Sequence, residues 1–219
     1  MLFRIYSDPI GTIISLIITM PALIISLTGH EFMHGYVAYK LGDPTPKNSG
    51  RLSLNPLRHL DILGSISLLL AGFGWAKPVP VNPYYLKKPK RDMSLIALAG
   101  PFANFFMAYI SILLYGILYA IGSIPWIIML MVEYLAIINI NLGIFNLIPV
   151  PPLDGSKVLF SILPDREYFK YMQFERYGMF ILIILLFTDI LTKPLNFLTN
   201  LVYSIMQTVA SGLLNIIGL

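Results

Sequence analysis

The chain of 219 residues contains no cysteine, which excludes disulfide bonds and zinc sites built from thiolates. Charged residues are scarce as well, since Asp, Glu, Lys and Arg make up 12% of the sequence, against about 25% in an average soluble domain. Hydrophobic residues account for 57% of the chain. This composition excludes an ordinary soluble enzyme and predicts an all-α integral membrane protein that crosses the bilayer several times.

The few basic residues are unevenly distributed. The formal net charge of +4 does not indicate nucleic-acid binding, because the positions of Lys and Arg explain it better. All of the 15 basic residues except Arg4 and Lys193 fall in connections on one side of the predicted topology. The positive-inside rule makes that side cytoplasmic and places the N-terminus outside the cell membrane.

Apolar segments alternate with connections rich in proline and polar residues, and residues 1–219 are predicted to form a single integral-membrane domain of about five spans. The segment at 62–75 is apolar for only about 14 residues, whereas a span needs about 20. It is therefore predicted to be re-entrant: a short helix, then a β-like extended stretch that returns to the same side. A short helix is also expected at 154–163. The apolar segments lie at 9–41, 62–75, 93–122, 125–148, 178–191 and 195–218.

Two of the three histidines form the pattern His30-Glu31-Phe32-Met33-His34. Positions i and i+4 of a helix share one face, so His30 and His34 can bind one Zn²⁺, and Glu31 can act as the general base on an activated water. The alternative is a pair of histidines that only pack or form hydrogen bonds. Ionisable residues at membrane depth are costly, which favours the functional interpretation.

A catalytic zinc needs a third protein ligand and an open position. Without cysteine, and with His59 in a polar loop, the candidates are acidic. Asp154 follows the span at 125–148 and reaches the same cytoplasmic depth as the His pair; its alternative role is a helix N-cap. Glu133 competes with Asp154 as a ligand, but it precedes Asp154 by a helix length of about 30 Å.

Five motifs together make the chain similar to the site-2 protease family of zinc intramembrane metalloproteases, in its compact form. They cover about residues 30–157. The motifs are His30-Glu31-x-x-His34-Gly35, Gly42-Asp43-Pro44-Thr45, Asn55-Pro56-Leu57-x-His59-x-Asp61, Gly100-Pro101-x-Ala103-Asn104 and Asn146-x-x-Pro149-x-Pro151-x-Leu153-Asp154-Gly155.

The resemblance implies a role for several residues. His30, His34 and Asp154 are expected to hold one zinc ion per chain, with Glu31 as the catalytic base. Asn146 is expected to help hold the substrate or the oxyanion. The substrate would be a transmembrane protein, cut in or near its membrane-spanning segment. The PDZ or CBS domain that the family commonly carries does not fit into this length.

A transmembrane helix must unwind before it is cut, so the enzyme needs a place for an extended segment. The stretch from Gly72 to Val81 is predicted to offer a strand edge for this purpose, with Gly72, Val79 and Val81 as substrate contacts. The alternative is that the stretch only fills the fold. Pro78 and Pro80 lack N–H donors and limit any pairing edge.

Two other functions compete with proteolysis. A membrane transporter or metal carrier could use the His pair as a transit site, but the outer halves of the spans contain few polar residues to line a path. An inactive protease homologue that only binds proteins would not need an intact Glu31. The predicted partners are a transmembrane protein substrate and the lipid bilayer, and no nucleic acid.

Overall fold

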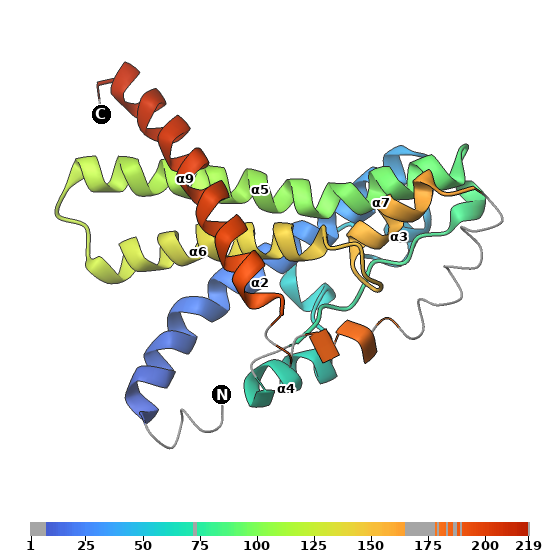
Figure 1. Ribbon diagram of the computed structural model, residues 1–219, viewed down its shortest axis with the longest axis horizontal. Coiled ribbons are helices and arrows are strands. Elements are labelled where there is room, and N and C mark those ends of the chain that lie inside the picture. The colour runs from blue at the N-terminus through green and yellow to red at the C-terminus, as the bar shows by residue number, and fades with distance from the viewer. Residues whose placement is uncertain are drawn as a thin grey trace.

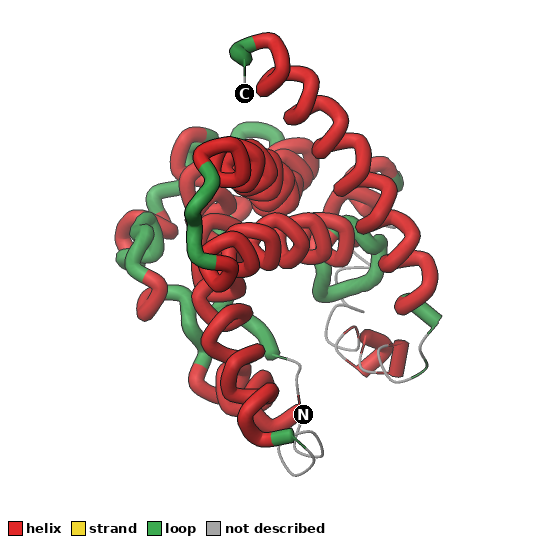
Figure 2. The backbone as a smooth tube through the Cα atoms, turned by 90° about the vertical axis from the view of Figure 1, so that its left-hand side faces the viewer, coloured by secondary structure: helices red, strands yellow, loops and turns green. Residues whose placement is uncertain are grey.

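The computed structural model describes residues 8–71, 74–164 and 178–218, except 179, 183, 186, 187 and 189. These described residues form helices and loops without a strand (Figures 1 and 2). The α-helices are α2 (Pro9–Lys40), α3 (Thr45–Asn48), α4 (Ile62–Ala71), α5 (Pro89–Ile121), α6 (Trp126–Asn146), α7 (Asp154–Ile162) and α9 (Thr192–Ile216). Two short 3-10 helices are η1 (Pro56–Arg58) and η2 (Pro83–Tyr85).

Within the described residues, four helices are long and apolar enough to cross a membrane: α2, α5, α6 and α9. The prediction of an all-α, multi-pass membrane protein is therefore confirmed. The segment predicted at 178–191 lies partly outside the described residues. Helix α5 begins earlier than the predicted residue 93, because Pro89 suits a first turn and Asp92 accepts the N–H of Lys88 at 2.9 Å.

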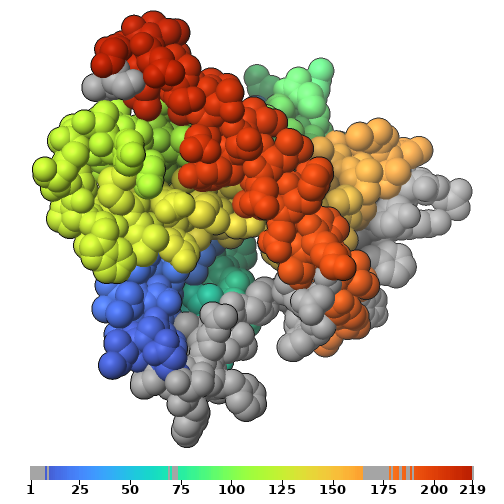
Figure 3. All heavy atoms as spheres, turned by 60° about the vertical axis from the view of Figure 1, so that its left-hand side comes forward, coloured from blue at the N-terminus to red at the C-terminus, as the bar shows by residue number. Residues whose placement is uncertain are grey.

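Small residues let the spanning helices approach closely. Ala108 of α5, Ala136 of α6 and Ala210 of α9 are buried together in one cluster, as is usual where helices pack inside a membrane. A Cβ on Gly116 of α5 would overlap the side chain of Leu214, so α9 passes directly against α5 at this point. Figure 3 shows α9 lying across the face that α5 and α6 present.

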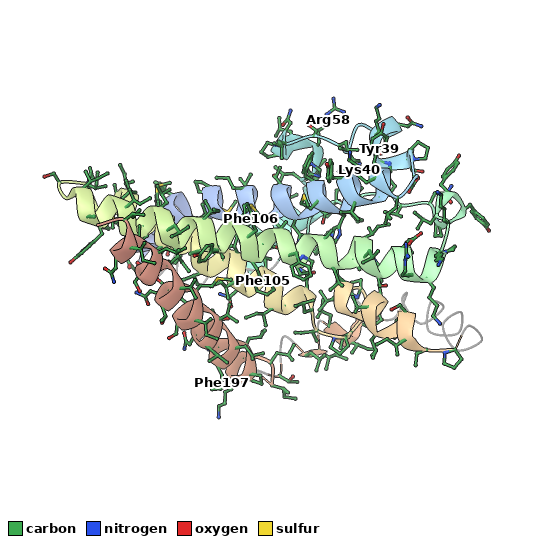
Figure 4. The ribbon with its side chains drawn as sticks, turned by 90° about the horizontal axis from the view of Figure 1, so that it is seen from above. Tyr39, Lys40, Arg58, Phe105, Phe106 and Phe197 are labelled. Atoms are coloured by element: carbon green, nitrogen blue, oxygen red, sulfur yellow. The ribbon has the colours of Figure 1, made fainter. Side chains whose placement is uncertain are left out.

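The two ends of the bundle differ in chemistry. The start of α2, the α5–α6 connection and the end of α9 lie toward one end, and α3 and α7 lie toward the other (Figure 1). Tyr39, Lys40 and Arg58 gather at this second end (Figure 4). Lys40 lies over the ring of Tyr36, 5.4 Å from its centroid, an arrangement that anchors helix ends at an interface. Which end faces the cytoplasm stays a prediction.

The two flanks of the segment at 62–75 lie side by side. Leu60 and Ala76 form an antiparallel bridge, and the N–H of Lys77 donates to the carbonyl of His59 at 2.8 Å. Helix α4 lies between these two ends of the hairpin. A Cβ on Gly64 would overlap the backbone of Trp75, so the returning chain runs directly against α4. The two flanks of the segment thus meet, as a re-entrant path requires, but its entry into the bilayer stays a prediction.

After the bridge, residues 76–82 run as an extended strap beside α2. The strap is held at both ends by backbone contacts. Asp43 is fully buried and accepts the N–H of Asn82 at 2.7 Å, while Arg51 lies 3.5 Å from the carbonyl oxygen of Pro78. The strap is the β-like stretch expected from the sequence, although its pairing is limited to the single bridge among the described residues.

Candidate metal centre

Three ligand atoms from distant parts of the chain meet at one point. Nε2 of His30 and Nε2 of His34 lie 3.0 Å apart, and each lies 3.1 Å from Oδ2 of Asp154. Tetrahedral zinc with bonds of about 2.0 Å separates its ligand atoms by about 3.3 Å. The three residues are buried and close enough to bind a metal ion, so this donor set fits zinc.

Helix α2 supplies both imidazoles and α5 forms the surface beneath them. The two rings lie 4.6 Å apart and are nearly perpendicular, at 88°. A Cβ on Gly100 of α5 would lie 2.5 Å from Cε1 of His30 and from Nε2 of His34. The glycine is therefore required for α5 to approach the ligand atoms so closely.

The second nitrogen of each imidazole is occupied by another partner. Nδ1 of His34 lies 2.7 Å from the carbonyl oxygen of Ile96. Since a carbonyl can only accept, Nδ1 must carry the proton, which leaves a lone pair on Nε2. Nδ1 of His30 lies 2.6 Å from Oδ1 of Asn104. Both rings therefore present Nε2 toward Asp154, as metal-binding histidines do.

Asp154 is the first residue of α7, and the N-cap position belongs to Leu153. The alternative interpretation of Asp154 as an N-cap is therefore wrong. A Cβ on Gly155 would overlap the carbonyl oxygen of Leu147, so the start of α7 is pressed against the end of α6. This contact fixes the depth of the carboxylate. Nζ of Lys157 lies 4.0 Å from Oδ1 of Asp154.

The two competing candidates lie elsewhere. Glu133 is in the first half of α6, whereas Asp154 follows the end of that helix, which is 21 residues long and so about 30 Å. His59 is buried in the loop after η1, and its Nε2 donates to the carbonyl of Ser53 at 2.7 Å. This contact ties the ring of His59 to the loop before η1.

Glu31 lies on α2 beside the first ligand and is half-buried. Its Oε2 accepts the backbone N–H of Val79 in the strap at 3.1 Å. The predicted base therefore lies between the ligand cluster and the strap.

Two cavities meet at this carboxylate. One of about 470 Å³ extends past His34 toward Lys157, and the other, of about 300 Å³, extends between Trp75 and Phe145. Residues common to both are His30, Glu31, Pro78, Asn146 and Pro152. Both cavities are lined mainly by apolar surface, and the larger one also reaches Asp154 and Lys157.

The residues predicted to contact substrate are distributed around these cavities. Asn146 lines both cavities, and its amide donates to the carbonyl of Leu142 at 2.9 Å. Val79 and Val81 line the larger cavity. Gly72 lies outside the described residues.

Asn104 links α5 to α2 through its contact with His30, a contact that the sequence did not predict. A local signal was present. Gly100 and Asn104 are spaced i and i+4, so they share one face of α5, and that face is pressed against the histidines.

The chain is similar to several metalloproteases. The sequence model of peptidase family M50 matches residues 120–188. The Bacillus subtilis (strain 168) protein named "Putative zinc metalloprotease YwhC" is 40% identical over 83% of this chain and 84% of its own length. "Putative zinc metalloprotease MJ0611" of Methanocaldococcus jannaschii is 32% identical over 78% and 87%. "Putative zinc metalloprotease Rip2" of Mycolicibacterium smegmatis is 28% identical over 84% and 72%.

No solved structure matches the chain significantly. The names of these relatives agree with the donor set described above, and together they identify zinc as the cofactor.

Proposed function

Because the chain belongs to the site-2 protease family, peptidase family M50, we propose that it is a zinc-dependent intramembrane endopeptidase that hydrolyses peptide bonds in or near transmembrane segments of membrane proteins. One observation carries the proposal. Three zinc-type ligand atoms lie within 3.1 Å of one another, beside a carboxylate that borders two cavities.

In this proposal His30, His34 and Asp154 hold the zinc ion. Two neutral imidazoles and one carboxylate leave a net positive charge at the centre and one position free, as in other catalytic zinc sites. When bound, zinc supplies the Lewis acidity that activates water and polarises the scissile carbonyl. All three side chains are buried and border the larger cavity.

Glu31 is the proposed general base. Its carboxylate takes a proton from the attacking water and later passes that proton to the leaving amine. The hydrogen bond from Val79 engages Oε2 only, which leaves Oε1 for this proton transfer. The same bond restricts the rotation of the carboxylate and so supports its orientation.

The substrate is proposed to enter as an extended segment, because a helix closed by its own backbone hydrogen bonds does not expose a scissile carbonyl. Val79 and Val81 border the larger cavity, which supports a docking role for the strap. Asn146 borders both cavities at the position of Glu31, which supports a role in holding the substrate or the oxyanion.

The protein is proposed to act in the cell membrane with the metal centre toward the cytoplasm and the N-terminus outside. The gathering of Lys and Arg at the end that carries α3 and α7 supports this orientation. Packing of α5 against α2, α6 and α9 supports a single integral-membrane domain over residues 1–219.

The test is Glu31→Gln in purified enzyme, with zinc content and cleavage of a transmembrane substrate measured on the same sample. The variant should keep about one zinc per chain and lose nearly all cleavage, because the ligands remain while proton transfer fails. Glu133→Gln is the matched control and should keep both. A Glu31→Gln enzyme with normal turnover would contradict the proposed base.

The same preparations separate proteolysis from transport. Reconstituted vesicles that take up zinc at equal rates with wild-type and Glu31→Gln protein, without any peptide cleavage, would favour a metal carrier over a protease.

A further inference from the structure

A chain of hydrogen bonds leads from His30 away from the metal centre and into the bundle. Nδ1 of His30 meets Oδ1 of Asn104 at 2.6 Å. The amide Nδ2 of Asn104 donates to Oδ1 of Asn139 at 2.8 Å, and Nδ2 of Asn139 donates to the carbonyl of Leu135 at 2.8 Å. Asn104 and Asn139 have no exposed surface, so water does not compete for these bonds.

The donor and acceptor of every hydrogen bond in this series follow from its last acceptor, the carbonyl of Leu135. The carbonyl of Leu135 can only accept, so Asn139 must turn its NH₂ group toward it and its oxygen toward Asn104. Asn104 must then turn its own NH₂ group toward Asn139. A second acceptor, the carbonyl of Ser26, lies 3.3 Å from the same nitrogen. The oxygen of Asn104 therefore faces His30.

The direction of these hydrogen bonds determines the tautomer of His30. Facing an oxygen that only accepts, Nδ1 must carry the proton, and the lone pair is left on Nε2, the atom that points at Asp154. A neutral imidazole without such a partner can carry its proton on either nitrogen. The tautomer of His34 is fixed directly by the carbonyl of Ile96. The tautomer of His30 is fixed through the side chains of Asn104 and Asn139.

We propose that Asn139 is a positioning residue of the metal centre, which acts through Asn104 to hold His30 in the tautomer that binds zinc. This inference rests on the proposed metal site but not on the proposed proteolysis. Groups that orient a metal-bound histidine typically change metal affinity by about 10- to 100-fold. Asn139 acts one step further away, so its loss should weaken zinc binding by about tenfold.

Asn141, on the same helix as Asn139, is a matched control. Asn141 donates to the carbonyl of Ile137 at 3.0 Å, just as Asn139 donates to Leu135. It also makes one bond to another helix, since its oxygen accepts the hydroxyl of Thr199 in α9 at 2.8 Å. The two asparagines thus have equal local roles, but Asn141 points away from His30.

The experiment compares Asn139→Leu with Asn141→Leu. Zinc affinity is measured by competition with a chromophoric chelator, and thermal unfolding is followed in the same detergent. The tautomers are read from the ring ¹⁵N shifts of metal-free, ¹⁵N-histidine-labelled protein, at a pH where imidazole is neutral. The chain has three histidines, so His30→Gln and His34→Gln suffice to assign the signals.

In the wild-type chain, His30 and His34 should both carry the proton on Nδ1. Asn139→Leu should bind zinc about tenfold more weakly and show a mixture of tautomers at His30 alone. Asn141→Leu should keep the wild-type zinc affinity and tautomers, with a similar loss of thermal stability.

Equal zinc affinities for Asn139→Leu and Asn141→Leu would overturn the proposal. A wild-type, metal-free protein with the proton of His30 on Nε2 would also overturn it, and this result does not depend on an asparagine variant. Neither result depends on peptide cleavage, so a failure here is distinct from a failure of the proposed protease.

Discussion

The backbone N–H of Val79 donates a hydrogen bond to Oε2 of Glu31 at 3.1 Å. Val79 stands between Pro78 and Pro80, which have no N–H. The amide of Val79 is thus the one donor in this tripeptide, and it is used by the predicted base rather than left for a substrate strand. The strap and the carboxylate are therefore coupled, and a change in one is expected to affect the other.

Val79→Pro should reduce cleavage of every substrate, because it removes the donor that orients Glu31. A loss of about 10- to 100-fold in kcat is expected for a misplaced catalytic group, with zinc content unchanged. Val79→Ala keeps the N–H and is the control, so it should stay near the wild-type rate. If Val79→Pro impairs only helical substrates and spares those already unwound by Gly or Pro, the strap acts in docking instead.

Replacing the third ligand should remove the metal. Asp154→Asn replaces the carboxylate with a neutral amide, which should weaken zinc binding by at least about 100-fold, more than the loss of an outer partner. Elemental analysis after gel filtration gives the zinc content. Glu133→Gln should keep its zinc, and a reversal of these two results would reassign the third ligand to Glu133.

Gly100→Ala should damage the metal centre although it adds one methyl group. That methyl would lie 2.5 Å from both imidazoles, so the rings or α5 must move, and zinc affinity should fall at least about tenfold. Gly212→Ala in α9 is the control, because no described atom lies within 4 Å of the added carbon. Equal zinc affinity in the two variants would mean that the close approach of α5 is not needed.

The predicted orientation can be tested with single cysteines, since the chain has none of its own. Asn48→Cys and Lys88→Cys lie at exposed positions on either side of the hairpin that contains α4, and both should react with an impermeant maleimide from the cytoplasmic side. Ser123→Cys, in the exposed α5–α6 connection, should react from the outside. Opposite labelling of positions 48 and 88 would exclude a re-entrant hairpin.

The metal cluster was predictable because each part had a local signal. The i and i+4 spacing places His30 and His34 on one helix face, and the basic residues place Asp154 at the same depth. The boundaries of α2 and α7 followed from proline and from the change to polar sequence. The earlier start of α5 depends on a capping bond from Asp92 that composition alone did not reveal.

Other features arise only when the helices pack. Asn104 and Asn139 are 35 residues apart, and nothing near either one in the sequence distinguishes Asn139 from Asn141. The bond between Val79 and Glu31 likewise joins two elements that meet in space. The alternation of Pro78, Val79 and Pro80 indicates that Val79 carries the one N–H donor. Its acceptor, Glu31, depends on the position of α2 in the fold.

The bridge between Leu60 and Ala76 closes the base of the α4 hairpin before the strap begins. The length of α4 determines how far the hairpin extends from this base, while the strap beside Glu31 starts only after it. The length of the hairpin and the position of the strap are thus set by separate parts of the sequence. A change in the length of α4 is therefore expected to alter how far the hairpin extends without displacing the strap beside Glu31.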